Sequence, residues 1–332
     1  MRPFAYLRPG SVAEAVRVSA ERPEARFLGG GTNLVDLMKL GVESPGLLID
    51  VSRLPLDRVV PTDDGGLRIG ATVRNSDLAA HPAVRERYPA LSQALLAGAS
   101  GQLRNTATTG GNLLQRTRCL YFQDTSKPCN KRQPGSGCPA REGVHRDLAV
   151  LGHSPDCVAT NPSDMAVALA ALDATVHLRG PEGERAVAAT EFHRLPGDNP
   201  DQDTVLRPGE MVVDVVLPPA PEGAASLYRK ARDRASYAFA LASVAAVLTV
   251  RDGRVAHASL AFGGLAHRPW RARAAEDVLR GAPATEETFA RAADAELAAA
   301  EPLRDNGFKV ALARNLAVGV LAELTDRAGR SR

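Results

Sequence analysis

The chain has 332 residues, a length that predicts about two domains with ample hydrophobic core. Apolar residues make up 44% of the chain and charged residues 24%, which is ordinary for a soluble globular protein and excludes a disordered or fibrous one. The formal net charge is only +3 and the arginines are scattered along the chain, so nucleic acid is not expected as a partner.

No segment of the sequence predicts membrane insertion. The first ten residues lack an apolar stretch of signal-peptide length. The most apolar run, 235–250, is too short and too rich in small residues to span a bilayer. We therefore expect a cytoplasmic protein, or a periplasmic one if the chain is exported folded with a partner subunit that carries the signal.

The first glycine-rich segment follows a predicted helix at 11–20, which a capping box of Ser11 and Glu14 begins. Residues 25–41 then predict a short strand, three consecutive glycines and a helix that ends at Gly41. Glycines at a strand-to-helix turn let backbone amides approach a phosphate closely. The pattern is neither G-x-G-x-x-G nor a Walker loop. A tight turn that needs positive φ explains it equally well.

A second glycine-rich segment follows predicted strands at 46–54 and 66–73 and an alanine-rich stretch at 76–98 that is predicted to be helical. Residues 108–112, with the sequence TTGGN, offer hydroxyls, backbone amides and a side-chain amide together. That set suits a pyrophosphate and the ribityl or ribose groups next to it. A simple turn is again the alternative.

The rest of the chain predicts mixed helices and strands. Ser163 can cap a helix at 164–174, and Asp164 lies in its first turn, where a carboxylate is favourable on its own account. A strand follows at 174–180. Proline-rich or charged stretches then predict a boundary or linker at 194–210 and 218–223. The last third predicts a strand, then a helix or buried run, a hairpin that turns at 252–253, and helices at 271–280, 285–300 and 308–327.

All four cysteines of the chain lie in one segment rich in loop-forming residues: Cys119, Cys129, Cys138 and Cys157. Their spacing, C-x9-C-x8-C-x18-C, differs from the C-x2-4-C pairs of zinc sites and from the C-x2-C-x2-C run of bacterial ferredoxins. Long irregular separations suit a loop wrapped around a bulky [4Fe–4S] cluster. A structural zinc ion and two disulfides stay open as alternatives. His145 and His153 are interpreted as loop residues rather than ligands.

Three motifs together carry a resemblance to a known family: LGGGTNLVDLMK at 28–39, RNTATTGGNL at 104–113 and NPSDMAVALAALDA at 161–174. In this order they resemble the FAD-binding medium subunit of the xanthine dehydrogenase family of molybdenum hydroxylases, over essentially the whole chain. The cysteine segment at 119–138 is similar to that of heterotrimeric aldehyde oxidoreductases whose flavin subunit carries an extra [4Fe–4S] cluster, and the periplasmic branch matches best. The flavin subunit of 4-hydroxybenzoyl-CoA reductase also has a cluster insert.

The resemblance implies an α+β fold of the vanillyl-alcohol-oxidase (PCMH) type for the FAD-binding domain, built from two subdomains. This domain would span 1–218 and include the cysteine insert at about 115–160. A smaller α/β domain, similar to the C-terminal domain of the carbon monoxide dehydrogenase flavoprotein, would follow at 224–328.

The resemblance also implies which residues hold FAD. The pyrophosphate and adenosine side would lie against Arg26, Phe27, Leu28, Gly29, Gly30, Gly31, Thr32, Asn33 and Leu34. The same cradle would continue with Gly101, Thr108, Gly110, Gly111 and Asn112. Asp164 would bond the ribityl or phosphate end, and Lys230 would approach the flavin from the C-terminal domain. The first glycine loop has no histidine or cysteine, so we expect non-covalent FAD. No catalytic acid or base is identified.

The chain lacks what a complete molybdenum hydroxylase needs. No cysteine remains for two [2Fe–2S] clusters and no room remains for a molybdopterin domain. The resemblance therefore implies a [2Fe–2S] small subunit and a molybdopterin large subunit as partners, with electrons passing from them to FAD and on to an external acceptor. The [4Fe–4S] cluster would relay electrons or hold an interface. Two alternatives are a stand-alone flavin reductase of the same fold and a zinc-stapled binding module whose glycine loops are only turns.

Overall fold

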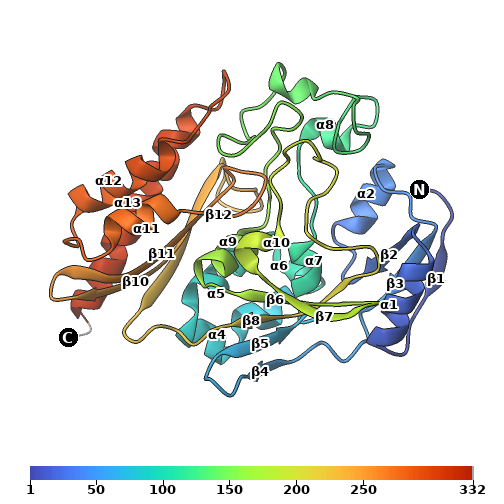
Figure 1. The fold of residues 1–332 in the computed structure, drawn as a ribbon, viewed down its shortest axis with the longest axis horizontal. Helices are drawn as coiled ribbons and strands as arrows, with labels where there is room; N and C mark the ends of the chain where they lie inside the picture. Colours follow the sequence, from blue (N-terminus) through green and yellow to red (C-terminus); the bar gives the residue numbers. More distant parts are fainter. Residues whose placement is uncertain (331–332) are drawn as a thin grey trace.

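The computed structural model describes residues 1–330, which form three β-sheets that follow one another along the molecule. Figure 1 shows the N-terminal sheet at one end, a larger central sheet, and the C-terminal sheet with its helices at the other end. The cysteine-rich segment rises above the central part as a separate group of loops. The mixed α and β content agrees with the predicted fold class.

The N-terminal sheet is parallel, with β3 between β1 and β2. The capping box predicted in this unit, Ser11 with Glu14, is confirmed in part. The Ser11 hydroxyl accepts a hydrogen bond from the Glu14 amide at 3.1 Å, but the Glu14 carboxylate accepts from the Gly10 amide instead of the Ser11 amide. The elements of this unit are β1 (Ala5–Leu7), α1 (Val12–Glu21), β2 (Ala25–Leu28), α2 (Leu34–Leu40) and β3 (Leu47–Asp50).

The central sheet has five antiparallel strands in the order β4-β5-β8-β6-β7. The helical region predicted at 76–98 is confirmed and is divided into three helices, because Pro82 and Pro89 each begin a new helix at its first position, where a missing amide hydrogen costs nothing. The strands are β4 (Val59–Pro61), β5 (Leu67–Gly70), β6 (Thr175–Gly180), β7 (Gly183–Ala188) and β8 (Met211–Leu217). The helices are α3 (Asn75–Ala80), α4 (Pro82–Arg87), α5 (Pro89–Ala97), α6 (Gly101–Arg104), α7 (Thr109–Leu113), α9 (Asp164–Ala171) and α10 (Ala189–Phe192).

Helix α9 lies between the central and C-terminal sheets. Ser163 caps it as predicted, since its hydroxyl accepts from the Ala166 amide at 3.0 Å. All eight residues of α9 are buried, because the helix contacts α5 on one side and the C-terminal strands on the other. Small side chains on the helix allow this close approach. The first residue of α9, Asp164, is thereby held at the junction of the two halves of the molecule.

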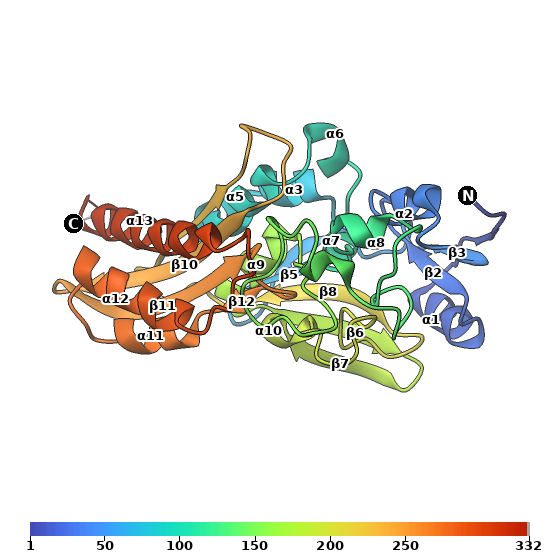
Figure 2. The same cartoon turned by 90° about the horizontal axis from the view of Figure 1, so that it is seen from above.

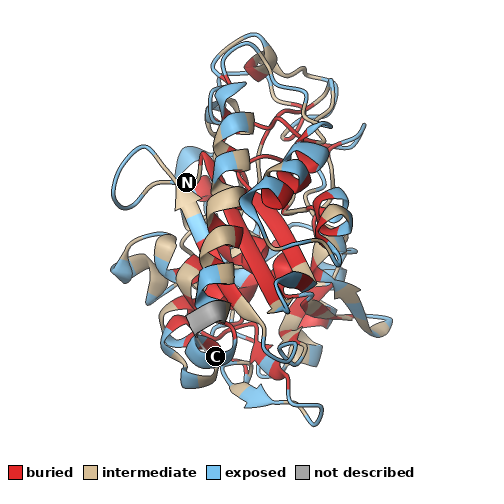
Figure 3. Cartoon of the chain, turned by 90° about the vertical axis from the view of Figure 1, so that its left-hand side faces the viewer, coloured by how far each residue is buried: buried red, intermediate tan, exposed pale blue. Residues whose placement is uncertain are grey.

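The C-terminal sheet is antiparallel, in the order β12-β11-β10-β9. Residues 225–251 form two strands, so no helix precedes the hairpin. Its turn is the predicted one, with Asp252 and Gly253 at φ of 51° and 72°, the left-handed values of a type I′ turn. The strands are β9 (Ala225–Ala231), β10 (Ala242–Arg251), β11 (Arg254–Gly263) and β12 (Trp270–Arg271), and the helices are α11 (Arg273–Leu279), α12 (Glu286–Leu297) and α13 (Phe308–Arg330). Figure 3 shows α13 lying across the buried strands with its outer side exposed.

Of the two predicted linkers, only 218–223 connects two sheets, since β8 belongs to the central sheet and β9 to the C-terminal one. The segment 194–210 lies between α10 and β8, inside the central unit, and packs against the cysteine-rich segment through Lys131 and Asp203. Within the insert only short helices occur, α8 (Leu120–Gln123) and a 3-10 turn at Pro139–Arg141. No helix among residues 1–330 is long and apolar enough to cross a membrane.

Candidate functional site

The two glycine loops dock against each other. A Cβ atom added at Gly30 would lie 2.0 Å from the Thr106 carbonyl oxygen, and one at Gly29 would lie 2.8 Å from the Thr108 hydroxyl oxygen. A side chain at Gly30 would collide with backbone, and one at Gly29 would displace the Thr108 hydroxyl. The first loop therefore needs glycine at Gly30 so that the second loop can pack on it, and this contact gives the glycines a structural role. Gly31 is needed for a different reason, its positive φ of 72°.

Some residues of the second loop stabilise the structure of the loop itself. The Thr108 hydroxyl caps α7 by accepting from the Gly111 amide at 3.2 Å. Gly110 packs against Ala71, which a Cβ atom would approach to 3.2 Å. Thr108 and Gly110 thus have structural roles that follow from turn chemistry. Gly111 and Asn112, in contrast, are turned toward a cavity.

That cavity has a volume of about 640 Å³, well within the range of pockets that bind cofactors. Its walls come from the N-terminal unit, the central unit, the cysteine-rich segment and the C-terminal sheet. Six of the residues expected to hold FAD line it: Thr32, Asn33, Gly111, Asn112, Asp164 and Lys230. The other expected residues lie outside the lining: Arg26, Phe27, Leu28, Gly29, Gly30, Gly31, Leu34, Gly101, Thr108 and Gly110.

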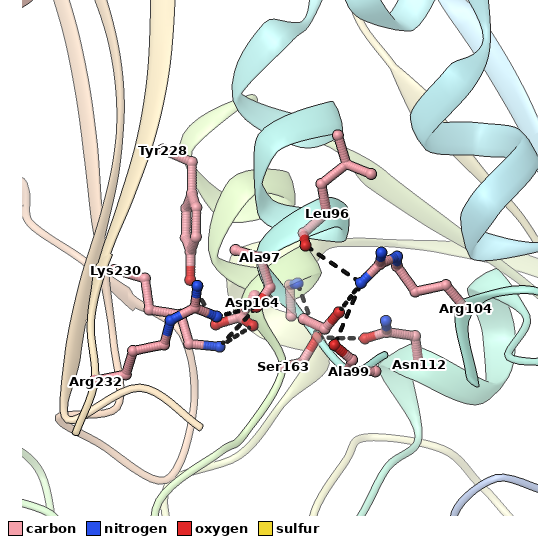
Figure 4. A network of polar contacts seen from close by, with 12 residues as sticks. Leu96, Ala97, Ala99, Arg104, Asn112, Ser163, Asp164, Tyr228, Lys230 and Arg232 are labelled. Atoms are coloured by element: carbon pink, nitrogen blue, oxygen red, sulfur yellow. Dashed lines mark hydrogen bonds and ion pairs between the residues drawn. The ribbon is translucent and has the colours of Figure 1, made fainter. Parts of the chain in front are cut away.

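A buried polar group spans the floor of the cavity (Figure 4). The Lys230 ammonium pairs with one carboxylate oxygen of Asp164 at 2.7 Å, and the Tyr228 hydroxyl donates to the other at 2.5 Å. Tyr228 and Lys230 are two residues apart on β9, so their side chains leave the same face of the strand. Burial, with the adjacent Asp164 charge, raises the pKa of Tyr228 well above its usual value. The phenol therefore stays a donor and the carboxylate is fully engaged by protein.

The end of α5 is fastened to the same floor. Lys230 and Arg232 both donate to the Ala97 carbonyl, at 3.2 and 3.1 Å. From the opposite side Arg104 donates to the Gly98 carbonyl at 2.7 Å. Figure 4 shows that Arg104 also contacts the Leu96 and Ala99 carbonyls. These contacts shape the cavity wall at 97–99, where Ala99 has a left-handed φ of 49°. Sequence reasoning missed Arg104 and Arg232, because nothing in their local sequence indicates which carbonyls they meet.

The charges that line the cavity suit an anion. Among residues 1–330, Arg104, Arg118 and Arg234 have no carboxylate within ion-pair distance, although each faces the cavity. Of the four aspartates in the lining, Asp164 pairs with Lys230, while Asp147 and Asp233 both pair with Arg146. The fourth, Asp36, acts on Arg118 electrostatically. Unpaired guanidinium groups favour phosphate oxygens. The donor set therefore fits a ligand that carries a diphosphate, such as FAD.

The four cysteines come together in one buried cluster. Cys119 and Cys157 belong to one apolar cluster, Cys129 and Cys138 are partly buried against that cluster, and none forms a disulfide. Burial raises the pKa of Cys119 to about 11 and that of Cys157 to about 12. Among the described residues, no group of three or more His, Cys, Asp or Glu side chains is arranged to hold a metal ion.

The two histidines of the insert make other contacts. The His145 ring is buried, with one nitrogen 3.2 Å from the Ala140 carbonyl and the other accepting from the Asp305 amide at 3.0 Å. His153 lies 2.7 Å from the Glu301 carbonyl. Cys119, by contrast, lines the FAD-sized cavity as well as belonging to the cysteine cluster. The cluster and the cavity therefore share a wall.

A buried charge network, missed from the sequence, holds the insert in place. Lys131 and Arg116 both pair with Asp203, and Arg116 also pairs with Glu43 at 2.7 Å. Burial alone would raise the pKa of Asp203, but the two positive charges outweigh it and lower that pKa to about 2. Burial, with the Lys131 charge nearby, lowers the pKa of His267 to about 4, so this ring is neutral. Residues from four separate segments meet here.

Comparison with known proteins places this architecture in a family. Residues 2–220 match the FAD binding domain in molybdopterin dehydrogenase, and residues 226–328 match the carbon monoxide dehydrogenase flavoprotein C-terminal domain. The chain belongs to the FAD-binding medium subunits of the molybdenum hydroxylases. It is thus an oxidoreductase subunit of the aldehyde oxidoreductase and xanthine dehydrogenase family.

Individual members of this medium-subunit family are similar over nearly their full length. The chain is 54% identical to the aldehyde oxidoreductase FAD-binding subunit PaoB of Escherichia coli, over 99% of this chain and 100% of that protein. It is 29% identical to the glyceraldehyde dehydrogenase medium chain of Sulfolobus acidocaldarius, over 82% of this chain and 79% of that one. A chain of the carbon monoxide dehydrogenase of Hydrogenophaga pseudoflava has the same fold, with a TM-score of 0.78, 28% identity, and coverage of 98% of this chain and 99% of that one.

Proposed function

We propose that this chain is the FAD- and [4Fe–4S]-binding electron-transfer subunit of a heterotrimeric molybdenum-containing aldehyde oxidoreductase, active only in that complex. The observation that carries the flavin part is the cavity of about 640 Å³, in which six of the expected FAD residues meet three unpaired arginines. The partners would be a [2Fe–2S] small subunit and a molybdopterin large subunit. The proposed domains are 1–218 and 224–328.

The residues of the cavity suggest how each part of FAD would be bound. Arg104 and Arg118 would hold the diphosphate. Asn112 is oriented by the Ser163 hydroxyl, which donates to its side-chain oxygen at 2.6 Å, so its amide nitrogen can donate to a ribityl or ribose oxygen. Because Asp164 is engaged by Lys230 and Tyr228, its role would be to hold the cavity floor and place the Lys230 charge. Since the first glycine loop contains neither histidine nor cysteine, FAD would be bound without a covalent link through that loop.

When bound, FAD supplies the exchange between one-electron transfer from iron–sulfur clusters and two-electron reduction of an acceptor. The protein contributes binding, orientation and charge. Cys119, Cys129, Cys138 and Cys157 would supply four thiolates to the [4Fe–4S] cluster, and their convergence on one buried cluster supports this assignment. The shared wall at Cys119 is compatible with either electron relay or a structural role.

The test is a cofactor analysis of the purified chain with its partner subunits. We expect one FAD released by denaturation without proteolysis, and about four irons and four acid-labile sulfides beyond those of the [2Fe–2S] subunit, the content of one [4Fe–4S] cube. Zinc, iron, sulfide and the visible spectrum should be measured on the same anaerobic sample. One zinc per chain without extra sulfide would overturn the cluster assignment, and a chain without flavin would overturn the electron-transfer function.

A further inference from the structure

A second, small cavity lies directly beside the cavity that would hold FAD. It is found where the end of α10 approaches β12, near the middle of the molecule in Figure 2. About 10 Å³ of it is available to the centre of a water molecule, which is room for a single water. The two cavities share part of their walls, namely Gln115, Thr160, Asn161 and Pro162.

Two buried histidine rings line the small cavity, and each has one ring nitrogen bonded to a backbone carbonyl. His193 Nε2 lies 2.8 Å from the Leu113 carbonyl oxygen, and His267 Nδ1 lies 3.0 Å from the Arg194 carbonyl oxygen. A carbonyl oxygen can only accept, so these two ring nitrogens carry the hydrogen atoms. The backbone therefore fixes the tautomer of both rings, and the other nitrogen of each ring has a free lone pair.

These two lone pairs meet no donor from the protein. Burial lowers the pKa of His193 and, with the Lys131 charge nearby, lowers that of His267 to about 4, so both rings are neutral at pH 7. Among the described residues, neither His193 Nδ1 nor His267 Nε2 has a hydrogen-bond partner, although both atoms are buried. Asp203 Oδ1, 3.7 Å from His267 Nε2, is an acceptor as well. Buried acceptors are nearly always paired, so two of them around one small cavity indicate a donor between them.

Two threonine hydroxyls complete the polar lining. The Thr117 hydroxyl accepts from the Cys119 amide at 3.3 Å, and the Thr204 hydroxyl accepts from the Leu206 amide at 3.4 Å. Since a hydroxyl group can donate while it accepts, each keeps its own hydrogen for an oxygen in the cavity. The lining thus offers two acceptors and up to two donors to one small ligand, the bonding pattern of a buried water.

A cation fits the small cavity less well than a neutral molecule. Asp203 already pairs with both Lys131 and Arg116, and these positive charges would repel a further one. Within residues 1–330, no three His, Cys, Asp or Glu side chains are arranged around a metal ion. The charges and the size of the cavity therefore both favour a neutral donor with one heavy atom.

We propose that the small cavity binds one structural water molecule, which donates to His193 Nδ1 and to His267 Nε2. The water joins the end of α10 to the connection between β11 and β12. Because Gln115, Thr160 and Asn161 belong to both cavities, it also supports the wall of the large cavity from behind. The site depends only on groups of this chain, so it goes beyond the proposed function and does not rest on it.

The first test is a high-resolution crystal structure of the full chain, with diffraction also recorded at the zinc and iron absorption edges. We expect one electron-density peak at about 2.7–3.2 Å from both His193 Nδ1 and His267 Nε2, without anomalous scattering. A cavity without density would overturn the proposal, because the two lone pairs would then be left unpaired. An anomalous peak would overturn it in favour of a metal ion.

The second test is a double-variant cycle of His193→Phe and His267→Phe, followed by thermal unfolding of the full chain. Phenylalanine keeps a ring of similar size and removes the acceptor that the water needs. Each single variant should lower Tm by about 2–4 °C. The double variant should lower it by less than the sum, because the bridge through the water can be lost only once. The bond from each ring to its carbonyl is also lost, but that loss cancels in the cycle.

His145 provides the matched control. Its ring is as buried as the other two, but the Ala140 carbonyl and the Asp305 amide engage both of its nitrogens. His145→Phe combined with His193→Phe should therefore give additive losses of Tm. Additive losses in the pair of His193 and His267 would overturn the shared water. If a variant does not fold, the crystal structure of the unmodified chain decides between the same outcomes.

Discussion

The buried pair of Lys230 and Asp164 offers the sharpest test of how the cavity floor is held together. The Lys230 side chain is 3% exposed and that of Asp164 is 8% exposed, and their charged atoms are 2.7 Å apart. The pair joins β9 of the C-terminal sheet to the first turn of α9. We consider Lys230→Met, which keeps the length of the side chain and its packed methylene groups and removes only the charge.

The expected loss follows from what the variant leaves behind. Without the ammonium, the Asp164 carboxylate stays buried with only the Tyr228 hydroxyl to stabilise it. Removing one partner of a buried ion pair costs about 3–5 kcal/mol, most of it the desolvation of the remaining charge. Tyr228→Phe removes one hydrogen bond to a charged group and should cost less, about 1.5–3 kcal/mol. Replacing both charged residues should cost less than the sum of the two single changes by about 2 kcal/mol.

The assay is urea unfolding of the chain after removal of FAD, so that cofactor loss does not enter the measured free energy. Lys230→Met, Asp164→Leu and the double variant complete a thermodynamic cycle, with Tyr228→Phe as a separate comparison. The reasoning is refuted if Lys230→Met lowers the free energy of unfolding by less than about 1 kcal/mol, the value typical of an exposed ion pair. Additive single and double variants would refute it as well.

Three further outcomes are expected. Gly30→Ala should separate the docked glycine loops and reduce both stability and FAD content, because its Cβ atom would meet a carbonyl oxygen at 2.0 Å. The control Gly10→Ala, whose Cβ atom has its nearest neighbour at 3.6 Å, should change neither property. Thermal unfolding and a flavin assay measure the two properties. Cys129→Ser should remove iron and labile sulfide while at least part of the FAD survives, since the flavin cavity uses other residues; equal loss of both would contradict separate sites. Burial lowers the pKa of Lys309 to about 7, so the unfolded chain binds more protons above that pH and stability should rise from pH 7 to pH 8. Lys309→Met should abolish that rise in urea titrations, and an unchanged slope would contradict it.

Local sequence patterns predicted much of the fold. The caps at Ser11 and Ser163, the helix end at Gly41 and the hairpin turn at Asp252 each depend on a few neighbouring residues, and each is found in the structure. The helical character of 76–98 was also predicted from composition, and the division of this region at Pro82 and Pro89 follows from proline at a first helical position.

The candidate site was predictable as a set of residues but not as a set of roles. Gly29 and Gly30 were expected to make room for a phosphate, and the structure uses them to make room for Thr106 and Thr108. Their role depends on which other loop approaches, and residues 76 and 79 positions apart along the chain give no sign of that contact. The Lys131–Asp203 pair is invisible for the same reason, because the two charges lie 72 residues apart.

The position of the cysteine insert connects the flavin cavity with the cysteine cluster. Arg118 lines the cavity and approaches Phe239, and the next residue, Cys119, belongs to the cysteine cluster. One dipeptide thus connects the proposed diphosphate site and the proposed iron–sulfur ligands. Because Arg116 anchors the same stretch to Asp203 at 2.5 Å, a change in the packing of the insert would move Arg118 as well. The insert therefore shapes the flavin cavity whether or not its cluster carries electrons, so Cys129→Ser is expected to lower the FAD content without abolishing it.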